Sequence, residues 1–222
     1  MKYIDELCER RKSLEPIKYD IVRAFEMIRD SFKSGNKLLI CGNGGSAADS
    51  SHITGELMKG FKKKRTIDEK FEKQLLKSIE EYLDKNSDFS SNVKLDEMKK
   101  NLEQGLPTID LTSFVGLNTA FANDKDANYV YANGVLGLGK DGDVLIAIST
   151  SGNSKNVVNA ALVAKAKGVK VIALTGRSGG ALKDIADLSI IVPNDETFLI
   201  QEDHIAIYHA ICLDIEDEFF QK

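Results

Sequence analysis

The chain has 222 residues, of which 42% are hydrophobic and 29% charged, and its formal net charge is −4. This length and balance fit a globular protein, so we expect one domain over residues 1–222. The absence of a basic excess argues against a nucleic-acid partner, and no apolar run approaches the roughly 20 residues of a membrane span. The charged N-terminus is unlike a signal peptide, and the scattered Cys8, Cys41 and Cys212 fit reduced, buried thiols. We therefore expect a cytoplasmic protein.

Residues 1–34 are predicted to form two helices that are broken near Pro16. Apolar and aromatic side chains recur at helical spacing along the second of them: Tyr19, Val22, Phe25, Ile28 and Phe32. This pattern is typical of a helix face that lies in the core or in a subunit interface.

A glycine-rich turn follows the first predicted strand. Residues 37–41 form a short apolar run, residues 42–46 (GNGGS) a turn, and residues 47–58 a helix that we expect Ser46 to cap. The free amides of such a turn, at a helix N-terminus, suit an anion and most often a phosphate. The turn matches neither the Walker A loop nor the dinucleotide fingerprint. A tight strand-to-helix connection without a ligand is the alternative.

A second unit of the same kind occurs later in the chain. Residues 143–148 read as a buried strand, residues 149–154 (STSGNS) as a turn rich in hydroxyl groups, and residues 155–166 as a helix. Two such turns are expected to meet at one edge of a parallel sheet. Hydroxyl and amide groups there can hold a phosphate without an arginine.

Five apolar runs alternate with helical patterns and are read as strands: 37–41, 106–111, 143–148, 170–175 and 188–192. This alternation predicts an α/β fold, a doubly wound five-stranded parallel sheet flanked by helices on both faces. The last helix is expected to run from near Thr197 to about Phe219.

Residues 62–105 do not show the alternation of apolar strand runs and helices that the rest of the chain shows. A basic run at 62–65 precedes two amphipathic helices joined by a loop at 86–92. The apolar positions of these helices are Phe71, Leu75, Ile79 and Leu83, then Leu95, Met98 and Leu102. We predict a helical hairpin that packs on the assembly or covers the pocket, with a partner-binding arm as the alternative. The basic run is predicted to be a solvated face rather than a phosphate contact.

The histidines suggest where chemistry occurs. His52 and Glu56 are four residues apart and share a helix face, which fits either a pair of metal ligands or a surface ion pair. Gln201 and His209 lie on the last helix, about 12 Å apart along its axis. His204, between them, is predicted either to pack or to support a neighbouring site residue.

The segments CGNGGSAADSSH (41–52) and AISTSGNSKNV (147–157) together resemble the sugar isomerase (SIS) family, which binds phosphosugars. Within that family the chain is most similar to the phosphoheptose isomerases. The resemblance covers almost the whole chain except residues 62–105, where the family implies only a short link. It therefore implies that 62–105 is a helical insertion, and that the protein is a homotetramer with active sites between subunits.

The resemblance also implies residue roles. Glu56 and His209 would be the catalytic acid–base residues, and a zinc ion would bind to His52, Glu56, Gln201 and His209. The residues implied to bind substrate are Asn43, Gly44, Gly45, Ser46, Asn123, Asp124, Ser149, Thr150, Ser151, Ser154 and Gln201.

The implied reaction converts sedoheptulose 7-phosphate to D-glycero-D-manno-heptose 7-phosphate, a precursor of nucleotide-activated heptose. Three alternatives remain. The first is a non-catalytic phosphosugar-binding scaffold resembling the DnaA initiator-associating protein, a type that lacks counterparts of Glu56 and His209. The second is an isomerase of another sugar phosphate. The third, a sugar-sensing regulator, is disfavoured because no DNA-binding motif is recognisable.

Overall fold

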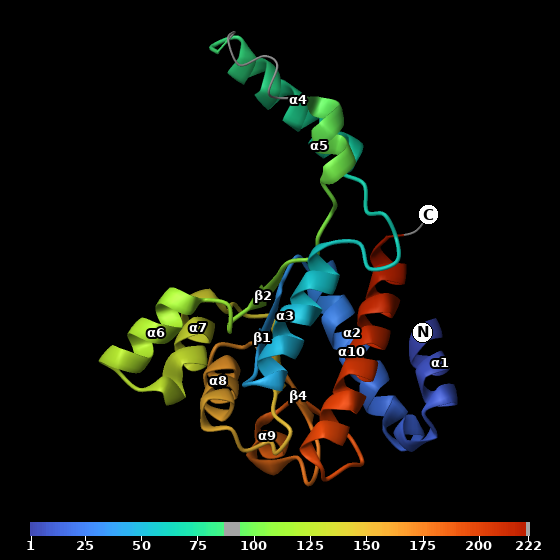
Figure 1. Ribbon diagram of the computed structural model, residues 1–222, viewed down its shortest axis with the longest axis vertical. Helices are drawn as coiled ribbons and strands as arrows, with labels where there is room; N and C mark the ends of the chain where they lie inside the picture. Colours follow the sequence, from blue (N-terminus) through green and yellow to red (C-terminus); the bar gives the residue numbers. More distant parts are fainter. Residues whose placement is uncertain (87–93, 221–222) are drawn as a thin grey trace.

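The computed structural model of the protein describes residues 1–86 and 94–220. Its centre is one parallel five-stranded sheet in the order β2-β1-β3-β4-β5 (Figure 1). The strands are β1 (Leu38–Cys41), β2 (Thr108–Asp110), β3 (Val144–Ile148), β4 (Lys170–Thr175) and β5 (Leu188–Ile191). Each predicted run contains one of them, so the doubly wound sheet is confirmed. The strand order reverses between β1 and β3, and ligands of such folds bind at the carboxyl ends of these two strands.

The helices match the predicted alternation, and the break near Pro16 falls in a short 3₁₀ segment. In chain order they are α1 (Lys2–Arg10), η1 (Lys12–Ile17), α2 (Lys18–Lys33), α3 (Gly45–Met58), α4 (Glu69–Leu83), α5 (Leu95–Asn101), α6 (Val115–Asp124), η3 (Ala127–Tyr129), α7 (Val130–Leu138), α8 (Lys155–Ala166), α9 (Gly180–Ile185) and α10 (Thr197–Phe219). No helix in the described ranges is long and apolar enough to cross a membrane.

Alternate side chains of each strand face opposite helical layers. Leu38 and Ile40 pack with α1, α2, α3 and α10, whereas Leu39 and Cys41 pack with α7, α8 and α9. Both faces are covered, as a parallel sheet requires. Along α2, Phe25, Ile28 and Phe32 are buried as predicted and Val22 is half-buried. Tyr19 is 72% exposed, so it does not belong to the core of this chain.

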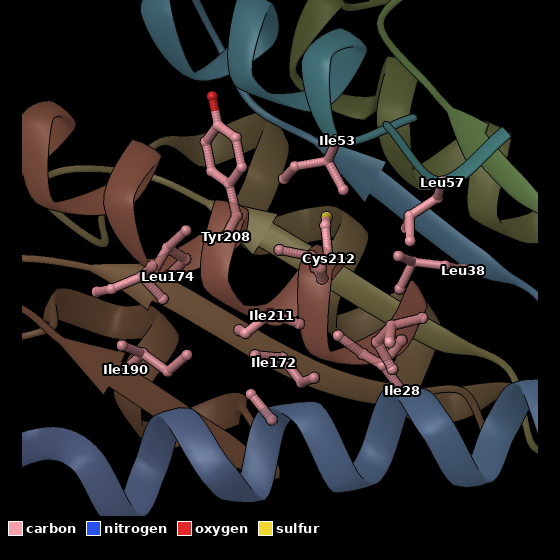
Figure 2. A pocket seen from close by; sticks show the side chains of 14 residues that line it. Ile28, Leu38, Ile53, Leu57, Ile172, Leu174, Ile190, Tyr208, Ile211 and Cys212 are labelled. Carbon is pink, nitrogen blue, oxygen red and sulfur yellow. The ribbon is translucent and has the colours of Figure 1, made fainter. Parts of the chain in front are cut away.

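The helices α3 and α10 lie side by side over one face of the sheet (Figure 1). Beneath them is an apolar cavity lined by core side chains such as Ile53, Ile172 and Ile211 (Figure 2). Tyr208 of α10 borders this cavity, and Figure 2 shows its hydroxyl pointing away from the apolar lining. The polar chemistry of this layer therefore lies above the cavity, between α3 and α10.

The helices α4 and α5, which we call the arm, lie against each other and extend away from the sheet (Figure 1). The helical nature of this segment is confirmed. Most of the predicted loop at 86–92 lies outside the described residues. An antiparallel bridge between Thr66 and Glu103 closes the base of the arm. In this chain the arm does not cover the α3–α10 surface, and its status as an insertion stays a prediction.

Candidate active site

The glycine turn after β1 is tighter than the sequence pattern suggests. Gly44 has a φ of 55°, a conformation that favours glycine, and α3 begins at the next residue, Gly45. The N-cap is therefore Gly44, and the prediction that Ser46 caps the helix is wrong. Ser46 lies in the first turn of α3, where its amide donates to the Asn43 carbonyl over 3.0 Å and its side chain is buried.

The glycine turn and the hydroxyl-rich turn meet at the carboxyl edge of the sheet, as predicted. The side-chain amides of Asn43 and Asn156 exchange two hydrogen bonds of 2.8 and 2.9 Å. The Tyr131 hydroxyl donates to the Gly42 carbonyl over 2.8 Å. Asn156 and Tyr131 are not among the predicted site residues. The polar start of α8 was a signal for Asn156, whereas Tyr131 stands in an apolar helix without one.

The hydroxyl-rich turn is compact. The hydroxyl oxygens of Ser149 and Ser154 are 3.0 Å apart. Gly152 has a φ of 67°, and a Cβ there would overlap with the Gly179 carbonyl, so the turn packs closely on the start of α9. Thr150, Ser151 and Ser154 are half-buried. Their hydroxyls and the amides of the glycine turn are suitable donors for phosphate oxygens.

The first part of α10 contacts the glycine turn. A Cβ at Gly45 would overlap with the Gln201 side-chain amide, so any other residue there would require Gln201 to shift. Gln201 thus lies at the glycine turn beside Gly45, and Gly45 precedes His52 by seven positions along α3.

Further along α3, three of the predicted catalytic and metal-binding side chains converge. The nitrogen Nε2 of His52 is 3.2 Å from Oε1 of Glu56, and the ring centroids of His52 and His209 are 4.9 Å apart. The Glu56 side chain is only 13% exposed. His209 Nε2 is buried and has no hydrogen-bond partner among the described residues. An unsatisfied imidazole nitrogen beside a carboxylate is available for proton transfer.

Burial controls the ionisation of several groups here. It lowers the pKa of His209, and the neighbouring His52 acts in the same direction, so the neutral imidazole is favoured. Burial raises the pKa of Asp49, against a hydrogen bond donated by Tyr208. Burial also raises the pKa of the Tyr208 hydroxyl, with the Asp49 carboxylate adding to the effect.

His204 and the cysteines have structural environments. His204 is fully buried, its Nε2 lies 3.2 Å from the Thr175 carbonyl, and burial lowers its pKa to about 4. This environment fits the packing alternative. Cys8, Cys41 and Cys212 are buried free thiols as predicted. Burial raises their pKa values, which disfavours the reactive thiolate.

The four predicted zinc ligands do not converge on one point in this chain. Gln201 contacts Gly45, whereas both ring nitrogens of His52 are engaged, Nδ1 with Tyr208 over 2.9 Å and Nε2 with Glu56. Over residues 1–86 and 94–220, no three His, Cys, Asp or Glu side chains are arranged as a metal site. The predicted zinc site stays a prediction.

Asn123 and Asp124 lie at the exposed C-terminal end of α6, which packs on α7 and η3. The Asn123 amide donates to the Asp124 carboxylate over 2.8 Å. Within the described part of the chain, neither side chain has a hydrogen bond to the two turns. Their predicted contact with substrate stays a prediction.

The basic run at 62–65 is not uniformly solvated, which corrects the prediction. Arg65 is 1% exposed, and it donates to the carbonyls of Leu57 over 2.6 Å and Glu56 over 3.1 Å and to the Glu216 carboxylate over 2.9 Å. The unpaired carbonyls at the end of α3 and a carboxylate on α10 satisfy the guanidinium. Burial alone would raise the pKa of Glu216, but the amides of Lys62 and Phe61 and the Arg65 side chain hold it below its usual range.

Comparisons with known proteins agree with this arrangement. The SIS domain family model matches residues 2–101 and 104–176. A phosphoheptose isomerase from Aliarcobacter butzleri is 36% identical over 207 residues, which cover 93% of this chain and 89% of the relative. A probable phosphoheptose isomerase from Thermoplasma acidophilum is 37% identical over 218 residues, 98% of each chain.

A solved structure supports the same family assignment. The phosphoheptose isomerase from Neisseria gonorrhoeae is 30% identical and superimposes with a TM-score of 0.71, covering 96% of this chain and 94% of that chain. The fold, the two turns and the sequence similarity lead to one conclusion: this chain belongs to the SIS domain family and groups there with the phosphoheptose isomerases.

Proposed function

We propose that the protein is a ketose–aldose isomerase that converts sedoheptulose 7-phosphate to D-glycero-D-manno-heptose 7-phosphate for nucleotide-activated heptose biosynthesis. The observation that carries the proposal is the convergence of Glu56 and His52, on the helix that begins at the glycine turn, with His209 of α10. The relatives named phosphoheptose isomerase support the choice of substrate.

In the proposed reaction Glu56 is the base that acts on carbon. It removes a proton from C1 of the ketose, O2 gains a proton, and an enediol forms. O1 then loses its proton, and Glu56 returns the first proton to C2, which yields the aldose. Glu56 is suited to this role because it is largely shielded and held by His52 over 3.2 Å and by Lys59 over 3.4 Å.

His209 is proposed to move the proton between O1 and O2 and to assist ring opening. Its lowered pKa keeps the imidazole neutral, so that it can accept a proton from one oxygen and donate it to the other. The two turns would hold the phosphate at the other end of α3. Gly45 and Glu56 are about 16 Å apart along the helix axis, which is longer than an extended seven-carbon sugar phosphate. We therefore propose that the active sites lie between subunits, so that a substrate held by the turns of one subunit meets Glu56 of a neighbouring subunit.

The experiment measures aldose phosphate formation by the purified full chain given sedoheptulose 7-phosphate. We expect turnover by the wild type and a fall in kcat of about 10²- to 10⁴-fold for Glu56→Gln and for His209→Asn. Glu81→Gln, on the exposed surface of the arm, is the matched control and keeps full activity. Thermal melts verify that all variants are folded.

Two outcomes would overturn the proposal. Full turnover in Glu56→Gln would remove Glu56 from the mechanism. A wild type that binds the sugar phosphate without converting it would favour the non-catalytic scaffold, whereas turnover of a different sugar phosphate would reassign the substrate.

We also propose that the protein binds zinc and forms a homotetramer. The support for zinc is that His52, Glu56 and His209 are neighbours and that imidazole and carboxylate are ordinary zinc ligands. The turnover assay, repeated with a chelator and with added zinc, tests this proposal. Turnover that is unchanged by both would mean that the reaction does not require zinc.

The support for assembly is the exposure of apolar side chains such as Phe71 and Tyr82 on the arm.

A further inference from the structure

We propose that the arms of two copies of this chain pair with each other along α4, side by side and antiparallel. The base of one arm, where α4 begins, then lies against the tip of the other arm, where α4 ends. The inference names one contact of the proposed homotetramer and does not depend on the isomerase activity.

The arm lacks a second layer of packing. In the described part of the arm, Ile79 is the single buried side chain of its two helices. Phe71, Leu76 and Tyr82 are 39–45% exposed, and the arm extends away from the sheet (Figure 1). Because helices of this length owe most of their stability to the packing of an apolar face, the arm needs a partner outside this chain.

One face of α4 has the spacing of a coiled-coil seam. Phe71, Leu75, Ser78 and Tyr82 follow one another at intervals of four, three and four residues, which places them in one row along the helix. Phe71 and Tyr82 are exposed, Leu75 is half-buried and the small Ser78 is exposed. The seam thus has an aromatic side chain at each end and a large and a small residue between them.

This seam complements itself when two copies run antiparallel. A two-fold axis near the middle of α4 brings Phe71 against Tyr82 of the second copy and Leu75 against Ser78 of the second copy. Large and small side chains then alternate across the contact. A parallel pair in register would place Ser78 opposite Ser78 and leave a gap in the seam.

The charges beside the seam select the same orientation. A second row of exposed residues, Lys70, Gln74, Lys77 and Glu81, precedes each seam residue by one position. The antiparallel pair brings Lys70 to Glu81 of the second copy and Lys77 to Gln74, whereas a parallel pair would place like charges opposite each other. The Glu81 side chain is 62% exposed and lies 3.7 Å from Lys77, so it is open to a further cation. Such exposed pairs add little affinity but set orientation.

The first test is cross-linking of the full chain. The three native cysteines are buried, so thiol reagents report on introduced cysteines. Positions 70 and 81 are about 16 Å apart along one helix, beyond the reach of a short bis-maleimide. We expect the double variant Lys70→Cys/Glu81→Cys to form covalent dimers on a denaturing gel. Each single variant is a matched control that stays uncrosslinked, because equal positions are also about 16 Å apart in the antiparallel pair.

The second test measures dissociation by sedimentation. Phe71→Ser and Tyr82→Ser should each raise the dissociation constant between copies at least about tenfold, because every seam contact occurs twice in a two-fold pair. In the double variant the two effects should multiply to less than their product, since the two side chains contact each other. Lys73→Ser, on the opposite face of α4, is the matched control and leaves the constant unchanged.

Each outcome decides the inference. Cross-linking in a single variant would show parallel arms and overturn it. An assembled double variant that does not cross-link would place the arm contact elsewhere and leave the homotetramer standing, whereas a monomeric wild type would overturn both. If thermal melts show that a cysteine variant does not fold, the sedimentation of Phe71→Ser and Tyr82→Ser decides. Turnover is measured separately, so a protein without isomerase activity leaves this result intact.

Discussion

Two helix pairs of this molecule differ in which side chains they bury and which they expose. The pair α3–α10 buries polar groups, whereas the arm exposes apolar ones. Asp203, His204 and Glu216 of α10 are at most 4% exposed, yet Phe71, Leu76 and Tyr82 of the arm are 39–45% exposed. Buried polar groups are costly unless they are hydrogen-bonded, so the first pair is held in one arrangement by its partners. The arm has no such constraint, and its surface suits contacts with another molecule.

The two regions are joined at Arg65. Its side chain binds the end of α3 and Glu216 of α10, while its carbonyl accepts from the Gln104 amide over 2.7 Å at the base of the arm. The same residue therefore anchors the arm and fixes the turn of α3 that carries Glu56. The arm therefore projects from the part of the molecule where Arg65 holds the end of α3 against α10.

The largest expected effect comes from breaking this anchor. Arg65→Met leaves the Glu216 carboxylate buried without its cation, and we expect a loss of about 3–5 kcal/mol in the free energy of unfolding. Urea denaturation measures it. The neighbouring Lys64→Met, at an exposed position, is the control and leaves the midpoint unchanged. A loss below about 1 kcal/mol in Arg65→Met would mean that Glu216 is satisfied by backbone amides alone.

A smaller effect is expected from His204, because the pKa of this buried imidazole falls from its ordinary value of 6.5 to about 4. Between these two pH values the unfolded chain binds a proton that the folded chain does not, so stability rises with pH in this window. Acidification from pH 6.5 to pH 4 should therefore remove about 3 kcal/mol. Denaturation at several pH values measures this slope, and His204→Leu should flatten it. An equal slope in the variant would contradict the assignment.

The smallest effect on chain stability is expected in the arm. Phe71 is 45% exposed, so Phe71→Ser should change the free energy of unfolding by less than about 0.5 kcal/mol. If the arm lies between copies of the chain, the same variant dissociates at higher protein concentration than wild type, as light scattering would detect. Lys70→Ser, one position away, is the control. Unchanged assembly in Phe71→Ser would place the contact elsewhere.

Local sequence patterns were sufficient to predict the fold. The helices predicted at 155–166 and 197–219 have those bounds in α8 and α10, and each predicted strand is present. These features depend on local apolar patterns and turns, which short stretches of chain carry in full. The spacing of His52 and Glu56 likewise brought them together, because four residues make one helical turn.

The surroundings of these residues depend on tertiary packing and could not be predicted from local patterns. The N-cap moved from Ser46 to Gly44 because a glycine with positive φ starts α3 earlier than the hydroxyl pattern suggests. Arg65 became buried because Glu216, 151 positions away, lies opposite it. Tyr208 meets His52 across 156 positions, and such pairs depend on how α10 packs on α3. Packing of this kind leaves no periodic trace along the chain, so a buried tyrosine or arginine reveals its role only in the folded protein.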